Sequence, residues 1–61
     1  MSIMNTWLTL DEAGSKYGIT HALILKWIEE GVVRCEMEGK IVARVNADDL
    51  ELMLRERLEN I

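Results

Sequence analysis

Residues 9–31 read TLDEAGSKYGITHALILKWIEEG, and this stretch predicts two short helices joined by a tight turn. Thr9 and Glu12 have the spacing of a capping box, in which each side chain accepts a hydrogen bond from the other residue's backbone amide. Gly18 is expected to end the first helix, because glycine adopts the left-handed conformation at little cost. The first helix is therefore predicted over residues 10–17.

The second helix is predicted over residues 21–30, with Thr20 as its N-cap and Gly31 as its stop signal. One face of this helix is apolar and is expected to lie in the core: Ile24, Trp27 and Ile28. Two helices joined by a short turn that contains glycine form the helix-turn-helix pattern.

The next segment, residues 33–45, alternates apolar and polar side chains and predicts a β-hairpin. A two-residue loop at Glu38-Gly39 would place Arg44 on the apolar face beside Val33. A three-residue loop over residues 38–40 puts all six apolar side chains on one face, so we expect this second register. It pairs Met37 with Ile41, Cys35 with Ala43 and Val33 with Val45.

A third helix is predicted from Ala47 to about Asn60, with Asn46 as its N-cap. Its apolar stripe consists of Leu50, Met53, Leu54, Leu58 and Ile61, and Leu52 lies off this stripe. The first half of the stripe is expected to pack on the two preceding helices. The far end extends past so small a core, and we expect a homodimer contact there, formed by Leu54, Leu58 and Ile61.

Length and composition limit what the chain can do. Its 61 residues predict a single domain over positions 1–61, too small to build the walls of a deep active site. The lone Cys35 cannot form an internal disulfide, and with the single His21 it does not give the spacing of a zinc site. With no nucleophile–base pair or phosphate-binding loop either, we expect no enzyme activity, cofactor or metal. No membrane span or signal peptide is recognisable, so a cytoplasmic protein is expected.

The net charge of −4 argues against a nucleic-acid partner until its distribution is considered. Residues 1–47 carry six acidic and five basic side chains, a balance of −1. Residues 48–61 carry five acidic and two basic side chains, a balance of −3. Most of the negative excess therefore lies in the third helix, away from the helix-turn-helix.

The predicted order of elements is helix, turn, helix, hairpin and helix, a mainly α fold with a small β-hairpin. Five segments carry a resemblance to a known family: Trp7-Leu8-Thr9-Leu10-Asp11-Glu12-Ala13, Tyr17-Gly18-Ile19-Thr20, Lys26-Trp27-Ile28-Glu29-Glu30-Gly31, Gly39-Lys40 and Asp49-Leu50. Over about residues 7–55 the chain resembles the MerR/excisionase-like family of winged helix-turn-helix DNA-binding domains.

This resemblance implies a small DNA-binding protein, either a transcriptional regulator or an excisionase-like accessory factor. The helix over about 21–30 would enter the major groove of double-stranded DNA, and the hairpin over 33–45 would act as a wing beside it. The family's DNA contacts fall, by position, on Thr9, Thr20, His21, Ala22, Leu25, Lys26, Lys40 and Arg44. Binding as a dimer to repeated half-sites is expected, since one copy offers few phosphate contacts.

The alternative function is a protein–protein interaction module on the same scaffold that has lost most of its DNA contacts. The family usually carries arginines just after the cap of the second helix, where this chain has His21 and Ala22. Leu25 lies about 100° from Ile24 around the helix and is expected to be partly exposed. An exposed Leu25 suits either thymine methyl groups or a protein partner.

Overall fold

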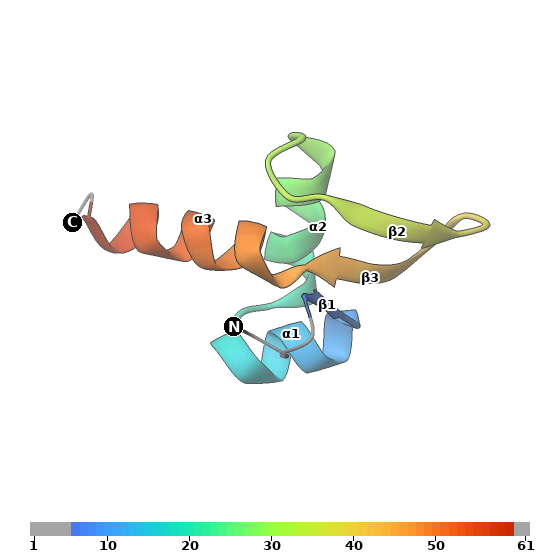
Figure 1. Cartoon of the computed structure of the whole chain (residues 1–61), viewed down its shortest axis with the longest axis horizontal. Helices are drawn as coiled ribbons and strands as arrows, with labels where there is room; N and C mark the ends of the chain where they lie inside the picture. Colours follow the sequence, from blue (N-terminus) through green and yellow to red (C-terminus); the bar gives the residue numbers. More distant parts are fainter. Residues whose placement is uncertain (1–5, 60–61) are drawn as a thin grey trace.

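The computed structural model describes residues 6–59, with side chains through residue 57. This part of the chain forms three helices and a small three-stranded antiparallel sheet, a mixed α/β arrangement (Figure 1). The elements are β1 (Trp7–Leu8), α1 (Leu10–Tyr17), α2 (His21–Glu29), β2 (Cys35–Glu38), β3 (Ile41–Asn46) and α3 (Ala47–Glu59). In Figure 1, α3 and the β2–β3 hairpin project from opposite ends of the molecule, with α1 and α2 between them.

The predicted capping box at the start of α1 is confirmed. The Glu12 backbone amide donates to the Thr9 hydroxyl at 3.1 Å, and the Thr9 amide donates to the Glu12 carboxylate at 3.0 Å. Gly18 ends the helix with a φ of 66°, in the left-handed region that glycine favours. The bounds of α1 are those predicted from the sequence.

Helix α2 also begins as predicted, with the Thr20 hydroxyl accepting the backbone N–H three residues further on at 3.1 Å. It ends at Glu29, one residue earlier than expected, and Gly31 follows with a φ of 82°. The Val32 amide then donates to the Trp27 carbonyl at 3.0 Å, the long bond of a Schellman motif. Gly31 is thus the stop signal that the sequence predicted.

The sheet contains one strand that the sequence did not predict. Strand β1 pairs antiparallel with β3, Trp7 opposite Asn46 and Leu8 opposite Val45, which makes the strand order β1-β3-β2. Two residues are too few to show the alternation that identifies a strand in a sequence. This strand connects the start of α1 to the centre of the sheet, so the architecture is more than a hairpin added to helices.

The predicted hairpin register is wrong. The loop contains two residues, Gly39 and Lys40, and not three. The pairs are Cys35 with Val45, Glu36 with Arg44, Met37 with Val42 and Glu38 with Ile41. The register shifts by one residue between Glu36 and Met37, which leaves Ala43 as an extra residue on β3.

The reason for this error is that the outer half of the hairpin is not buried. Ile41 is 70% exposed and Met37 is 54% exposed, so the burial of one apolar face does not select the register there. Gly39 instead supports the tight loop, because its φ of 64° suits a two-residue hairpin turn. The shift at Ala43 then turns Ile41 onto the face of Glu38, away from Met37.

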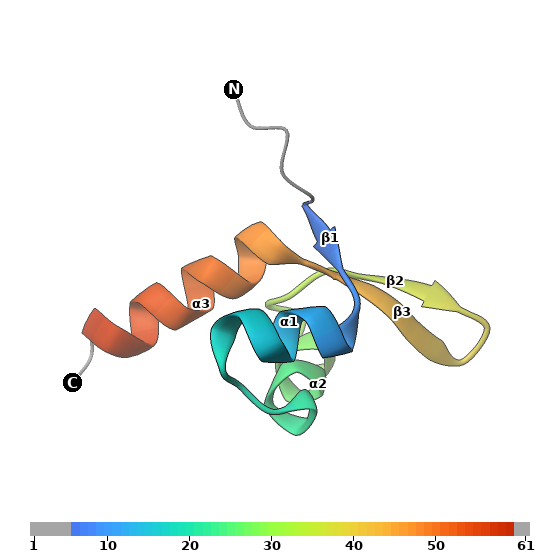
Figure 2. The same cartoon turned by 90° about the horizontal axis from the view of Figure 1, so that it is seen from below.

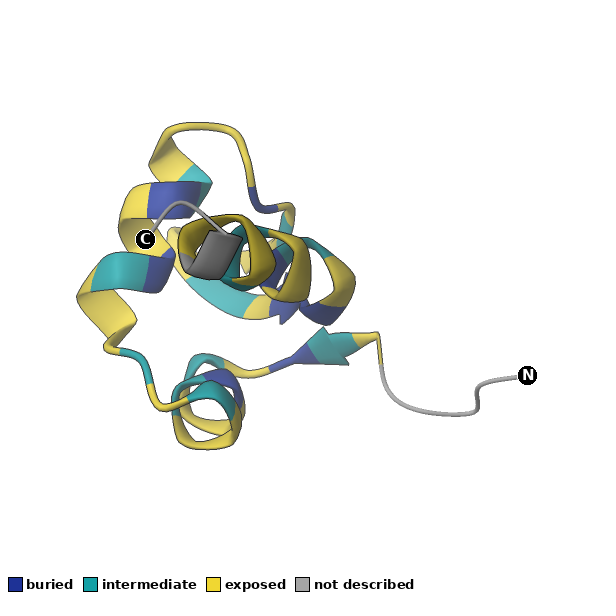
Figure 3. Ribbon diagram, turned by 90° about the vertical axis from the view of Figure 1, so that its left-hand side faces the viewer, coloured by how far each residue is buried: buried dark blue, intermediate teal, exposed yellow. Residues whose placement is uncertain are grey.

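The core lies where the sheet, α1, α2 and the start of α3 meet (Figure 3). Its buried apolar side chains are Leu8, Ala13, Ile24, Trp27, Val33, Val45, Ala47 and Leu50. Cys35 is half-buried against this core, in the role of a small apolar residue. Asn46 is the single buried polar residue among those described, and its side-chain oxygen accepts the Asp49 amide at 2.9 Å. The prediction that Asn46 caps α3 is therefore confirmed.

Helix α3 follows the predicted stripe as far as its side chains are described. Leu50 is buried, Met53 and Leu54 are half-buried against the core, and Leu52 is 51% exposed. The other two residues of the proposed dimer contact, Leu58 and Ile61, lie outside the described side chains. Within residues 6–59, no helix has the length and apolar character needed to cross a bilayer.

A hydrogen bond joins the end of α1 to α3. The Tyr17 hydroxyl donates to the Glu51 carboxylate at 2.7 Å. Partial burial, together with this bond and the charge of Glu51, raises the pKa of Tyr17 from 10.0 to about 12. Because the pKa is higher in the folded state, the contribution of Tyr17 to stability is complete below pH 10 and is lost as the pH rises through about 12.

We predict that Tyr17, the chain's only tyrosine, ionises near pH 12 in the folded protein. Its tyrosinate absorbance can be followed in an alkaline titration, with circular dichroism at each pH to identify the range in which the protein stays folded. Glu51→Ala should move the transition toward pH 10, since it removes both the acceptor and the negative charge. An unchanged transition in the folded variant would contradict the contact.

Candidate nucleic-acid interface

The N-terminal half of α2 presents an exposed face. The residues of α2 that the sequence assigned to a DNA contact are all exposed: His21, Ala22 and Leu25 in this half, and Lys26 in the last turn. Leu25 is 42% exposed, as expected from its position beside the buried Ile24. The helix packs through Ile24 and Trp27 on its other side, so this face is available to a partner.

This helix end differs from the other two in charge. The first turn of α2 contains no acidic residue, whereas the first turn of α1 holds Asp11 and Glu12 and that of α3 holds Asp48 and Asp49. Carboxylates near a helix N-terminus neutralise its positive end and repel other anions. Among the three helices, α2 alone has no carboxylate of its own in its first turn, and the carboxylate that does reach this end, that of Asp11, comes from α1 and lies 3.1 Å from the His21 ring.

His21 is held within the fold. Its Nε2 lies 3.1 Å from the Asp11 carboxylate of α1. Its ring also packs beside Gly14, where an added Cβ would come within 3.4 Å of the ring and 3.1 Å of the Ile19 carbonyl oxygen. His21 thus links α2 to α1, and glycine at position 14 leaves room for that close approach. The structure gives His21 a positioning contact in addition to its exposure.

Thr9 and Arg44 are brought together at the junction of α1 with the sheet, where Figure 2 shows α1 starting beside β3. With Trp7 and Glu12 they line a depression of about 270 Å³. The Thr9 hydroxyl already accepts the helix amide, and the Arg44 guanidinium lies 3.9 Å from the Glu36 carboxylate. Glu12 and Glu36 offset the charge of Arg44, so this depression is no strong anion site.

Within the described residues, Lys26 and Lys40, unlike Arg44, have no carboxylate paired with their charge. Among the residues that the structure describes, neither lysine forms an ion pair. Lys26 lies on the exposed face of α2, and Lys40 lies in the loop at the end of the projecting hairpin (Figure 1). These two lysines are the cations best placed to contact phosphate groups.

Sequence reasoning missed the ion pair that holds the hairpin in place. The Arg34 Nε donates to the Asp49 carboxylate at 2.9 Å, and the Arg34 backbone amide donates to the same group at 3.0 Å. The hydrogen bonds from Arg34 lower the pKa of Asp49. The pair fixes the segment between α2 and β2 to the start of α3. The two residues are 15 positions apart, and no local motif indicates that they meet.

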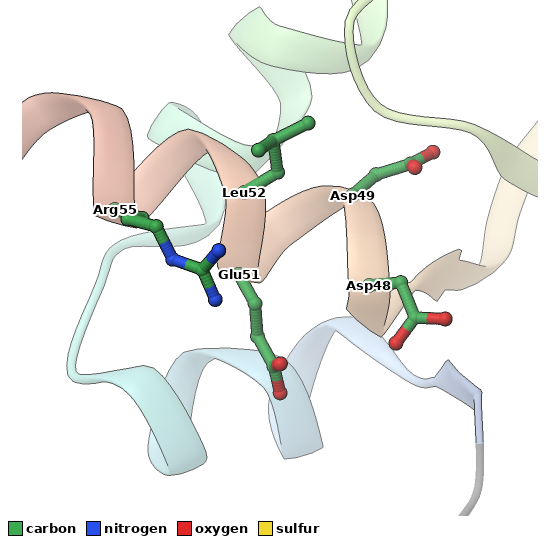
Figure 4. A pocket seen from close by; sticks show the side chains of 5 residues that line it. All are labelled: Asp48, Asp49, Glu51, Leu52 and Arg55. Atoms are coloured by element: carbon green, nitrogen blue, oxygen red, sulfur yellow. The ribbon is translucent and has the colours of Figure 1, made fainter.

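The acidic surface is concentrated on α3. Figure 4 shows a depression on this helix that is lined by three carboxylates, those of Asp48, Asp49 and Glu51, together with Leu52 and Arg55. Much of the negative charge that the sequence concentrates in residues 48–61 therefore also lies together on the surface, along α3. The hairpin loop with Lys40 projects at the end of the molecule opposite to α3 (Figure 1).

Within the described part of the chain, no group of three or more histidine, cysteine, aspartate or glutamate side chains is placed to hold a metal ion. Comparison of the chain with protein-family models, with curated proteins and with solved structures gives no match.

Proposed function

We propose that this protein binds double-stranded DNA as a winged helix-turn-helix domain. The N-terminal half of α2 lies in the major groove, and the β2–β3 hairpin is the wing beside it. The observation that carries the proposal is the character of α2: its first turn has no carboxylate, and its outer face is exposed and bears Lys26. A duplex with a phosphate on each strand every ~3.4 Å requires a surface of this kind.

The arrangement of the other elements supports this role. In helix-turn-helix proteins the second helix enters the groove with its N-terminal residues against the base edges. The His21–Asp11 contact sets the position of α2 against α1, and the Arg34–Asp49 pair sets the base of the hairpin. Both restrict the movement of the two proposed DNA-contacting elements. Lys40 in the hairpin loop would then contact the phosphate backbone beside the groove.

Affinity for DNA should be low for one copy. Two lysines that neutralise two phosphates give a salt dependence of about −1.8 in log K against log salt. A homodimer on repeated half-sites, joined through Leu54, Leu58 and Ile61 of the third helix, would double the number of contacts and raise the avidity. We propose that such a dimer acts by binding and not by catalysis, as a transcriptional regulator or an excisionase-like accessory factor.

We predict that Lys26→Ala and Lys40→Ala each weaken binding to a labelled random duplex and each reduce the salt slope by about 0.9. The reason is that each lysine releases about one counterion when it contacts a phosphate. Fluorescence anisotropy at increasing salt concentration measures both quantities. The matched control is Arg55→Ala, which removes one positive charge from α3, away from the proposed surface.

The control separates a local contact from the effect of total charge. If Arg55→Ala weakens binding as much as the two lysine variants, the attraction is long-range and the assignment of the surface is wrong. If the unaltered protein shows no binding even at low salt, DNA binding itself is excluded.

A protein partner is the second candidate, and the exposed apolar residues near α2 favour it. Leu25 and Val32 are 42% and 43% exposed. Isolated exposed apolar residues are common, so this observation is weaker than the charge pattern of α2. Leu25→Glu would disrupt a protein contact at this position and leave the core intact, which makes it the variant to use with any partner that is found.

A further inference from the structure

The exposed face of α2 carries few groups that can form hydrogen bonds with bases. Ala22 and Leu25 are exposed and apolar, and the Thr20 hydroxyl is already used as the helix cap. His21 is engaged by Asp11 at 3.1 Å. Among the α2 residues assigned to a DNA contact, Lys26, in the last turn of the helix, is thus the one whose exposed cation forms no ion pair within the described residues.

The major groove offers one apolar group to such a surface. Guanine, cytosine and adenine present hydrogen-bond donors and acceptors, and thymine adds a methyl group at C5. An apolar side chain placed over donors or acceptors takes them out of water without replacing their hydrogen bonds, which is unfavourable. The same side chain placed over a thymine methyl group buries hydrocarbon against hydrocarbon.

We infer that α2 recognises thymine methyl groups through Ala22 and Leu25, so that the target half-site contains thymine where these residues lie. This inference rests on the proposed DNA-binding function. Residues three apart on a helix have Cβ atoms about 5–6 Å apart. Successive base pairs are ~3.4 Å apart, so the two side chains span one or two base steps.

The charge of the surroundings supports DNA as the occupant of this apolar face. Lys26 is the neighbour of Leu25 in the sequence, is exposed and forms no ion pair among the described residues, whereas the carboxylate nearest the first turn of α2, that of Asp11, is paired with His21 at 3.1 Å. A positively charged residue beside an apolar strip complements a groove that is lined by phosphates and contains methyl groups. A protein partner for the same strip is an outcome that the experiment below distinguishes.

The test compares duplexes that differ only in the C5 methyl group. An alternating A·T duplex and the same duplex with deoxyuridine in place of thymidine have the same hydrogen-bonding groups. The reverse comparison adds the methyl group: a G·C duplex has none at C5, and the same duplex with 5-methylcytosine has one on each substituted base. We expect anisotropy titrations to show about fourfold tighter binding for each methyl group contacted, because the burial of one CH₂-sized group changes an affinity by about that factor.

Variants then assign the effect to α2. Leu25→Ser should lower the affinity ratio between the thymine and uracil duplexes by about fourfold, to the part contributed by Ala22. Lys26→Ala should lower the affinity for both duplexes and preserve their ratio. The control is Leu52→Ser, which changes a leucine on α3 that is 51% exposed. It should alter neither the affinity for the duplexes nor the ratio of the thymine and uracil affinities.

The outcomes separate this inference from the function on which it rests. Salt-dependent binding with equal affinity for the thymine and uracil duplexes overturns methyl recognition and leaves DNA binding in place. A methyl preference that is undiminished in Leu25→Ser overturns the assignment to α2. Absence of binding to every duplex at low salt overturns both proposals and redirects attention to a protein partner at Leu25.

Discussion

Replacing Leu50 with alanine should lower the free energy of unfolding by about 2–5 kcal/mol. Leu50 is fully buried at the start of α3, where it packs with the core formed by the sheet and the other helices. The loss combines the transfer of the side chain to water with the cavity that remains. A 61-residue domain has only about 3–9 kcal/mol of stability, so the variant should be close to unfolding at room temperature.

Urea denaturation followed by tryptophan fluorescence measures this change. The matched control is Leu52→Ala, the same substitution two residues later on the same helix, where the side chain is 51% exposed. This control should change stability by no more than about 0.5 kcal/mol. Equal destabilisation by the two substitutions would contradict the packing of α3 described above.

The second large effect is expected from Asn46→Ala, with a loss of about 1–2 kcal/mol. Asn46 is only 2% exposed, and its side-chain oxygen accepts the Asp49 amide in the first turn of α3. Alanine leaves that amide without its acceptor at the point where β3 continues directly into the helix. The thermal midpoint should fall by about 4–8 °C for each kcal/mol lost.

Asn46→Ser is the control, since serine keeps a side-chain oxygen in the capping position. This variant should recover at least half of the stability lost in Asn46→Ala, by the same thermal or urea measurement. If the two variants are equally destabilised, the contribution of Asn46 comes from its packing and not from the cap.

The helices could be predicted from the sequence because their end signals are local. Thr9 and Glu12 lie three residues apart, and each makes the bond that this spacing predicts. Gly18 and Gly31 both adopt positive φ at the predicted helix ends. Capping motifs and left-handed glycines involve only near neighbours in the chain, so the sequence contains all the information that they require.

The sheet was predicted less well because its geometry depends on long-range packing. The predicted register requires one whole face of the hairpin to be buried, but Ile41 and Met37 are exposed, in the part of the hairpin that projects into solvent. Strand β1 forms because Trp7 and Leu8 meet the end of β3, nearly forty positions later in the chain. Neither fact follows from local periodicity.

The exposure of the candidate DNA-binding face of α2 could be predicted from the sequence, but the ion pairs around it could not. Helical periodicity correctly placed Leu25 and Lys26 on the outer side of α2. The engagement of His21 by Asp11 depends on the crossing of α1 and α2, which no sequence pattern specifies. The Arg34–Asp49 pair is a further contact of this kind.

The measurement that tests the central claim most directly is an amide NMR titration of the labelled protein with a short duplex at low salt. DNA binding through α2 and the hairpin loop predicts that the largest chemical-shift changes fall on residues 20–26 and 38–41. The exposed residues Glu51, Leu52 and Arg55 of α3 should change little. Largest shifts on α3, or no shifts at saturating duplex, would contradict the account.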